Sequence, residues 1–392
     1  MSHVEEEDGE PLSPMARVFQ SPGNNCCIVT MIGCKTKINA DVILRALNHN
    51  VSKHPRFSSK LSNDGVSWIK TQVNVEDHVH VVDIDPKEIG EKGENFVEDY
   101  VSSLTMLPLD KSKPLWDIHI LNVKTSDAEA VCVIRSHHSL GDGTSLMSLL
   151  VACTQKTSVL DTFPSIPVHK PRKIVHREKG SWFLRSILAI FSSARLIWNT
   201  LVDILLALAI ILFLKDTKTP LKGDVGVESN PNKFCHRIVS LDDIKNIKEV
   251  MNMTINDVLL GVTQAALSRY LSNFPGKIRL TAGVFVNLRP YTGIQVGAIL
   301  LARAASNTTT SISNMVGPME EISFHGHEIA YIAPSVYGHA HALTIHFLSY
   351  ADKMVISIGV DTKVVPNPHK LCDEMEDSLK AMKAAILERE LL

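Results

Sequence analysis

The sequence predicts a layered α/β protein with two domains, and three observations support this fold class. The chain has 392 residues, of which 45% are hydrophobic, so it is long enough to bury two sizeable cores. Segments with the alternation of a β-strand are interleaved with segments that have the spacing of an amphipathic helix. Residues 155–180 carry proline, lysine and arginine between two such blocks, which is typical of a linker.

The first block contains both element types. The expected strands are 26–34, 66–83, 116–123 and 131–134, and the expected helices run from after Asn39 to about His54 and over 93–105. The second block opens with two N-terminal capping pairs, Ser240 with Asp243 and Thr254 with Asp257. It continues with a helix over 255–271, strands over 278–288 and 321–333, a hairpin over 341–360 and a final helix over 368–391.

The most informative motif is His137-His138-Ser139-Leu140-Gly141-Asp142-Gly143. It lies between the expected strand at 131–134 and an apolar helical run over 144–153, where a rigid scaffold carries side chains into a cleft. An imidazole is well suited to take a proton from a hydroxyl near neutral pH. Buried core histidines are the alternative interpretation, and the strand, the helix and the motif spacing together favour a catalytic one.

The composition and the absence of certain motifs exclude several classes of protein. The net charge of −2, without a clustered basic excess, predicts no nucleic-acid binding. Seven cysteines without a C-x-x-C spacing argue against a disulfide framework and a structural zinc site, and they fit a reducing cytosolic environment. No Walker loop and no Gly-x-Ser-x-Gly elbow occurs in the sequence. The acidic start predicts a solvated tail rather than a cleavable signal peptide.

The motif resembles the H-H-x-x-x-D-G signature of CoA-dependent acyltransferases. Further segments narrow the resemblance to the plant bifunctional wax ester synthase/diacylglycerol acyltransferase family, over nearly the whole chain. These segments are 9–14, 54–57, 108–110, 114–116, 286–290, 313–318 and 333–338. The resemblance implies two chloramphenicol-acetyltransferase-like domains with a tunnel between them. It also implies acyl transfer from acyl-CoA, a substrate rather than a cofactor, to a long-chain fatty alcohol, with diacylglycerol as a further acceptor.

The resemblance also suggests roles for the motif residues. His138 would be the proton acceptor, and His137 would shape the pocket. Asp142 would be a structural anchor, paired with Arg289 at an N···O distance under about 3.5 Å. Gly143 is expected to be structural within the substrate pocket.

Weaker hypotheses concern other polar residues. Asn314 could donate a hydrogen bond to the developing oxyanion, and a turn asparagine is an equally good interpretation. The pairs His325/His327 and His339/His341 have a spacing that zinc can use. No third ligand is fixed by the pattern and the resemblance implies no metal, so we expect none.

The chain departs from the family pattern after Arg289-Pro290. Only sixteen residues, 291–306, precede Asn307, where the family has a much longer stretch. We therefore expect an incomplete second domain. The expected division is an acidic tail at 1–10, an N-terminal acyltransferase domain at 11–160, a linker at 161–235 and a shortened C-terminal acyltransferase domain at 236–392. Two alternatives remain: an acyltransferase for a soluble alcohol or phenolic acceptor, and an inactive form that acts as a binding partner.

Residues 182–214 are the most apolar part of the sequence. The stretch 196–214 can just cross a hydrocarbon layer of about 30 Å. Asp203 near its middle costs roughly 2.5–3.5 kcal/mol on insertion, and each Leu or Ile returns about 0.3–0.6 kcal/mol, so the balance is close. A spanning helix, interfacial helices and a core helix remain open, and we favour contact with membrane lipid. We expect the endoplasmic reticulum or plasma membrane, with cytosolic catalytic domains.

Overall fold

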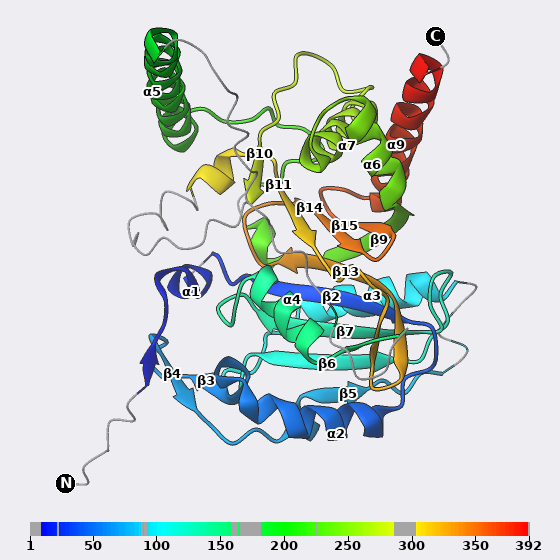
Figure 1. The fold of residues 1–392 in the computed structure, drawn as a ribbon. Coiled ribbons are helices and arrows are strands. Elements are labelled where there is room, and N and C mark those ends of the chain that lie inside the picture. Colours follow the sequence, from blue (N-terminus) through cyan, green and yellow to red (C-terminus); the bar gives the residue numbers. More distant parts are fainter. Residues whose placement is uncertain are drawn as a thin grey trace, which may run out of the picture.

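The computed structural model describes Pro164 and residues 9–157, 182–285 and 303–390, apart from 22, 86, 88, 90, 91 and 225. Two large mixed sheets with helices around them form the molecule, which confirms the predicted α/β class (Figure 1). A small third sheet, in the order β1-β4-β3, lies near the N-terminus. Its strands are β1 Glu10–Pro11, β4 Ser67–Lys70 and β3 Ser59–Leu61.

The first large sheet has seven strands in the order β5-β6-β7-β2-β13-β12-β8. The strands are β5 Val79–Val81, β6 Trp116–Leu121, β7 Ala130–His137, β2 Cys27–Cys34, β13 His327–Tyr337, β12 Ile322–Phe324 and β8 Gln155–Lys156. On one face, α3 Gly93–Thr105 packs against alternate residues such as Val29 and Val133. The opposite face, with α2 Ala40–Asn50 and α4 Gly143–Ala152, contains a cavity.

The second large sheet has five strands in the order β10-β11-β14-β15-β9. Their bounds are β10 Ala282–Phe285, β11 Thr310–Val316, β14 Leu343–Tyr350, β15 Lys353–Asp361 and β9 Asn232–Ser240. Helices α6 Leu241–Val250, α7 Ile255–Tyr270 and α9 Pro368–Glu390 cover one face, and Ile345 and Phe347 pack into that core. The other face is turned toward the first sheet (Figure 1).

Two strands from the C-terminal half of the chain join the first sheet. β12 and β13 come from the C-terminal half, yet β13 pairs antiparallel with β2 along Cys27–Cys34. The strands before and after this excursion, β11 and β14, pair with each other in the second sheet. A division of the chain at residue 236 therefore does not separate the two sheets, because strand pairing joins residues that are distant in sequence.

Several expected elements differ in detail from the observed ones. The expected strand at 66–83 is two short strands, β4 and β5, with the 3₁₀ turn η3 Val75–Asp77 between them. The expected strand at 321–333 is divided into β12 and β13 by a tight turn at His325-Gly326, where both residues have positive φ. Residues 286–302, which include Arg289 and most of the proposed shortening at 291–306, lie outside the described residues.

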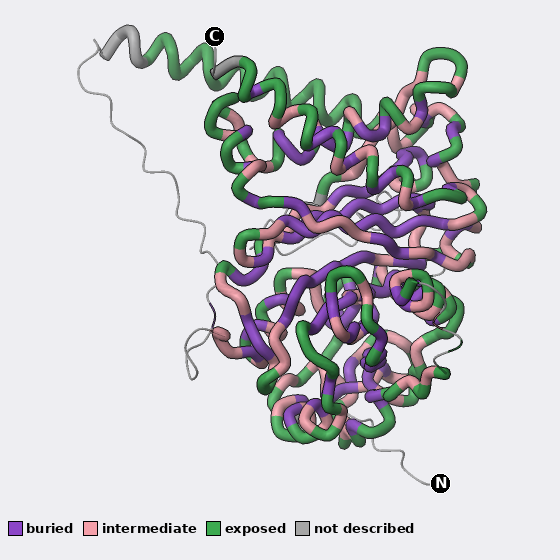
Figure 2. The backbone as a smooth tube through the Cα atoms, turned by 90° about the vertical axis from the view of Figure 1, so that its right-hand side faces the viewer, coloured by how far each residue is buried: buried purple, intermediate pink, exposed green. Residues whose placement is uncertain are grey.

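Helix α5, Trp182–Leu212, projects away from both sheets (Figures 1 and 2). Its segment Ser186–Leu212 has no part buried within the structure and is the one helix, among the described residues, long and apolar enough to cross a membrane. The C-terminal end of α5 is held by Asn307, whose Nδ2 donates to the carbonyl of Ile210 at 2.6 Å. A core helix, one of the three sequence interpretations, does not fit this exposure.

Candidate active site

Alternate side chains of strand β7 point to opposite faces of the first sheet. Cys132, Ile134 and Ser136 line the cavity, as does His138 immediately after the strand. Arg135 points to the other face, where it forms a buried salt bridge with Asp117. The two-residue period of the strand therefore carries His138, but not its neighbour His137, into the cavity.

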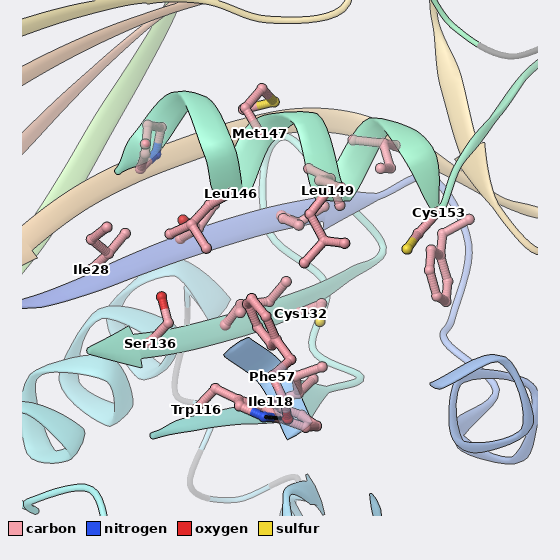
Figure 3. Close-up of a pocket in the computed structure, with 18 of the residues that line it drawn as sticks. Ile28, Phe57, Trp116, Ile118, Cys132, Ser136, Leu146, Met147, Leu149 and Cys153 are labelled. Carbon is pink, nitrogen blue, oxygen red and sulfur yellow. Dashed lines mark hydrogen bonds between the residues drawn. The ribbon is translucent and has the colours of Figure 1, made fainter. Parts of the chain in front are cut away.

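The cavity has a volume of about 250 Å³ and is mostly apolar. It lies between α4 and the first sheet: Figure 3 shows Leu146 and Leu149 of α4 pointing toward strands β2 and β7, with Trp116 at the opposite wall. At one end it reaches His138, and the second sheet contributes Ser313, Met315 and His346. Further along, the lining includes Leu47, Phe57 and Cys153. This arrangement suits an aliphatic chain whose polar end lies beside an imidazole.

The imidazole of His138 is fixed by its surroundings. Its ring stacks on Phe19 of α1 Pro14–Phe19, with centroids 4.1 Å apart, and its backbone N–H donates to the carbonyl of Cys26 at 2.9 Å. Burial lowers the pKa of His138, although the carbonyls of His138 and Gly141 and the carboxylate of Asp142 oppose the shift. A lowered pKa keeps the ring neutral, the form that can accept a proton, at neutral pH.

The neighbouring ring of His137 is held in a separate hydrogen-bond network. Its Nδ1 lies 2.7 Å from Ser139 Oγ and 3.2 Å from Gln20 Nε2, and its Nε2 lies 3.1 Å from Asn25 Oδ1. Burial, then the nearby His138, lower its pKa to about 4. His137 does not line the cavity, so it can shape the pocket only by fixing the loop that carries His138.

Asp142 is the N-cap of α4. Its carboxylate accepts a hydrogen bond from the backbone N–H of Ser145 at 2.8 Å. The capping role could have been recognised in the sequence, because an aspartate before an apolar helical run is a common N-terminal signal. The expected partner Arg289 lies outside the described residues, so the Asp142–Arg289 salt bridge stays a prediction.

Gly143 lies where the two halves meet. A Cβ built on this residue would lie 2.6 Å from Sδ of Met315 on β11, well inside van der Waals contact. Both residues line the cavity. A glycine here therefore lets the N-terminus of α4 approach the second sheet closely, beside the end of the cavity that contains His138.

The hypothesis for Asn314 needs correction. Ser313 and Met315 line the cavity, whereas Asn314, between them on β11, points the other way. Its Nδ2 donates to Oδ1 of Asn256 on α7 at 2.6 Å. The alternation of a strand turns its side chain away from the cavity, so Asn314 is not placed to bind an oxyanion there.

Among the described residues, one group of side chains has the spacing of metal ligands, and the pairs His325/His327 and His339/His341 do not belong to it. His327 accepts a hydrogen bond from the backbone N–H of Asn39, and His341 contacts Thr308 Oγ1 at 2.9 Å. The grouped ligand atoms belong instead to His80, Asp117 and His119. The Asp117 carboxylate is already paired with the Arg135 guanidinium, which would repel a bound cation.

His346 is the cavity residue that the sequence motifs did not indicate. It lies in the middle of β14, opposite Ser313 of β11 in the strand register. The hairpin pattern around 341–360 predicts the strand but not which cavity its side chains reach, because that depends on how the two sheets pack.

Comparisons with known proteins show the family of the chain. Residues 35–259 match the model of the wax ester synthase/diacylglycerol acyltransferase catalytic domain, and residues 279–383 match the WS/DGAT C-terminal domain. The chain is 52% identical to wax ester synthase/diacylglycerol acyltransferase 7 of Arabidopsis thaliana over 484 aligned positions that cover 100% of both proteins. It is 53% identical to wax ester synthase/diacylglycerol acyltransferase 10 of the same plant, over 97% of this chain and 98% of the relative. Because 484 positions exceed the 392 residues of this chain, the first relative contains residues that this chain lacks.

Solved structures show the same fold. The wax ester synthase/diacylglycerol acyltransferase from Marinobacter aquaeolei VT8 superposes with a TM-score of 0.64 at 17% identity, covering 96% of this chain and 99% of that one. A starter condensation domain of rhizomide synthetase in complex with C8-CoA gives a TM-score of 0.55 at 13% identity, covering 99% and 97% of the two chains. With both family models matched and close relatives aligned end to end, the chain belongs to the wax ester synthase/diacylglycerol acyltransferase family.

Proposed function

We propose that this chain transfers a long-chain acyl group from acyl-CoA to the hydroxyl of a fatty alcohol, giving a wax ester. The observation that carries the proposal is the position of His138, which lines a mostly apolar cavity. Family membership supports acyl-CoA as the donor and an O-acyltransferase as the enzyme class. The apolar lining supports an aliphatic acceptor over a soluble alcohol or phenolic one.

The neutral imidazole of His138 removes the proton from the acceptor hydroxyl as its oxygen attacks the thioester carbonyl. A C–O bond forms, and a tetrahedral intermediate with a negatively charged oxygen results. Its collapse breaks the C–S bond, and the departing CoA thiolate takes the proton from the imidazolium. Holding both substrates together makes the attack effectively intramolecular, so no acyl-enzyme is required. Asp142 and His137 act by holding the loop and helix around His138.

An assay with labelled acyl-CoA tests the donor, the acceptor and the base together. The chain is incubated with hexadecanol, diacylglycerol or a soluble alcohol, and compared with His138→Ala. His49→Ala, which removes an exposed imidazole on α2, is the matched control. We expect wax ester from the unmodified chain and the control, and about 10²–10⁴-fold less from His138→Ala. Triacylglycerol from diacylglycerol would extend the acceptor range.

Other outcomes decide against this function. Product with soluble alcohols alone would replace the proposed acceptor class. A folded chain that forms no product with any acceptor would support the alternative of an inactive form that binds a partner. The additional residues of the first relative give that alternative a specific basis.

We further propose that α5 attaches the enzyme to the endoplasmic reticulum membrane, or to the plasma membrane, with both sheets in the cytosol. Leu201, Leu205 and Leu208 are among many large apolar side chains that α5 exposes. An exposed apolar surface of this length fits contact with lipid. The seven cysteines are free thiols, which fits the reducing side of the membrane.

Flotation with phospholipid vesicles tests the attachment. Replacing Leu201, Leu205 and Leu208 by Asp should release the chain into the lipid-free fraction, since each carboxylate opposes burial in hydrocarbon. Asn199→Asp, which adds one charge at a residue that is already polar, is the control and should still float. Retention of the triple variant on vesicles would contradict attachment through α5, and protease protection in microsomes would test the cytosolic placement.

A further inference from the structure

Besides His138, three histidines line the cavity: His54, His327 and His346. Of these, His346 is the one that the second sheet contributes. His346 lies on β14, on the face turned away from α6, α7 and α9, and only 8% of its surface is exposed. It lines the same cavity as His138. The bound substrates would therefore lie between an imidazole on the first half of the chain and an imidazole on the second.

The ring of His346 has an unused hydrogen-bonding group. Its Nδ1 is buried and has no hydrogen-bond partner within the described ranges. Leaving a buried polar group unpaired costs about 1–3 kcal/mol, so such a group in a native protein calls for an explanation. A substrate atom in the cavity would supply the missing partner.

The charge state of His346 allows it to donate a hydrogen bond. Burial, then the nearby His138, lower its pKa to about 4, so the ring is neutral at neutral pH. A neutral imidazole has one N–H donor and one acceptor nitrogen. It can therefore donate one hydrogen bond to an atom in the cavity.

The chemistry creates a need for such a donor. During attack on the thioester, negative charge develops on the carbonyl oxygen, and the walls of the cavity are mostly apolar. A preorganised donor in a water-excluded site stabilises that charge strongly. Resting on the proposed function, we propose that His346 donates a hydrogen bond to the carbonyl oxygen of the acyl thioester and so stabilises the oxyanion of the tetrahedral intermediate.

Kinetics of two His346 variants test this role. His346→Leu removes the donor and keeps an apolar shape, and His346→Gln keeps an N–H group. We expect kcat to fall about 10²–10³-fold in the Leu variant with little change in KM, and the Gln variant to recover part of the loss. Ser357→Ala is the matched control, because Ser357 is the buried β15 neighbour of His346 and does not line the cavity. It should retain the unmodified kcat.

A spectroscopic readout keeps the test independent of turnover. The infrared carbonyl stretch of bound acyl-CoA labelled with ¹³C at the thioester carbon should lie at lower frequency in the unmodified chain than in His346→Leu. If the unmodified chain forms no ester but shows this frequency shift, the proposed function is refuted, whereas the hydrogen bond from His346 to the thioester carbonyl is supported. Unchanged kcat and carbonyl frequency in folded His346→Leu, or a larger kcat loss in Ser313→Ala than in His346→Leu, would overturn the assignment.

Discussion

The N-cap of α4 gives a prediction whose size follows from the structure. Asp142 satisfies the N–H of Ser145, and α4 supplies cavity residues such as Leu146 and Leu149. Asp142→Ala loses a cap of about 1 kcal/mol and a carboxylate at a helix N-terminus of about 0.5 kcal/mol, for a total of about 1.5 kcal/mol. Asp142→Asn keeps the cap and removes the charge, whose contribution at the helix N-terminus is about 0.5 kcal/mol.

Thermal unfolding in detergent separates the two variants. With an unfolding entropy of about 2.1 cal/mol/K per residue, 1 kcal/mol shifts Tm by about 1.2 °C in a chain of 392 residues. We therefore expect Tm to fall by about 2 °C in Asp142→Ala and by about 0.6 °C in Asp142→Asn. Ser240→Ala removes the equivalent cap of α6, whose Ser240 Oγ accepts from the N–H of Asp243 at 3.2 Å, far from the cavity. That control should lose Tm but not kcat. Equal losses of Tm in the Ala and Asn variants would refute the capping argument and indicate instead that the charge of Asp142 is essential.

Three further predictions concern pH, packing and charge burial. Burial lowers the pKa of His138, so kcat/KM should stay constant as the pH falls to about 6.5, the unperturbed pKa of histidine, and should decline only at lower pH. A decline centred above about pH 6.5 would contradict a neutral buried base. Gly143→Val should reduce kcat and Met315→Ala should restore part of it, since the added side chain would contact Sδ of Met315; absence of any recovery in steady-state kinetics would place the defect elsewhere. Arg135→Leu should destabilise the protein by about 3–5 kcal/mol because it leaves the carboxylate of Asp117 buried without its guanidinium partner, and a Tm like that of the unmodified chain would exclude this cost.

Local patterns in the sequence predicted local structure well. The helix expected over 93–105 is α3, and the final helix and the hairpin around residue 351 lie where expected. His138 lies after a strand and before a helix, as the motif indicated. These features depend on periodicity and caps, which neighbouring residues determine.

Features that depend on long-range packing could not be predicted in the same way. The pairing of β13 with β2 joins residues about three hundred positions apart, and no local pattern specifies it. The same limitation applies to Asn314 and His346: one was expected in the site and points away, and the other was not expected and lines it. Strand alternation gives each residue a face, but only the packing of two sheets determines which face meets the cavity.

The excursion of β13 into the first sheet ties assembly of the catalytic cavity to synthesis of the whole chain. Until β13 emerges and docks, β2 has an open edge of unpaired backbone groups, which is prone to pairing with other chains. A fragment ending before residue 327 would retain His138 yet present that edge permanently, and we expect it to aggregate. The interlocked connection also limits how far the two halves can separate, so we expect substrates to enter through side-chain or loop motions rather than by wide opening.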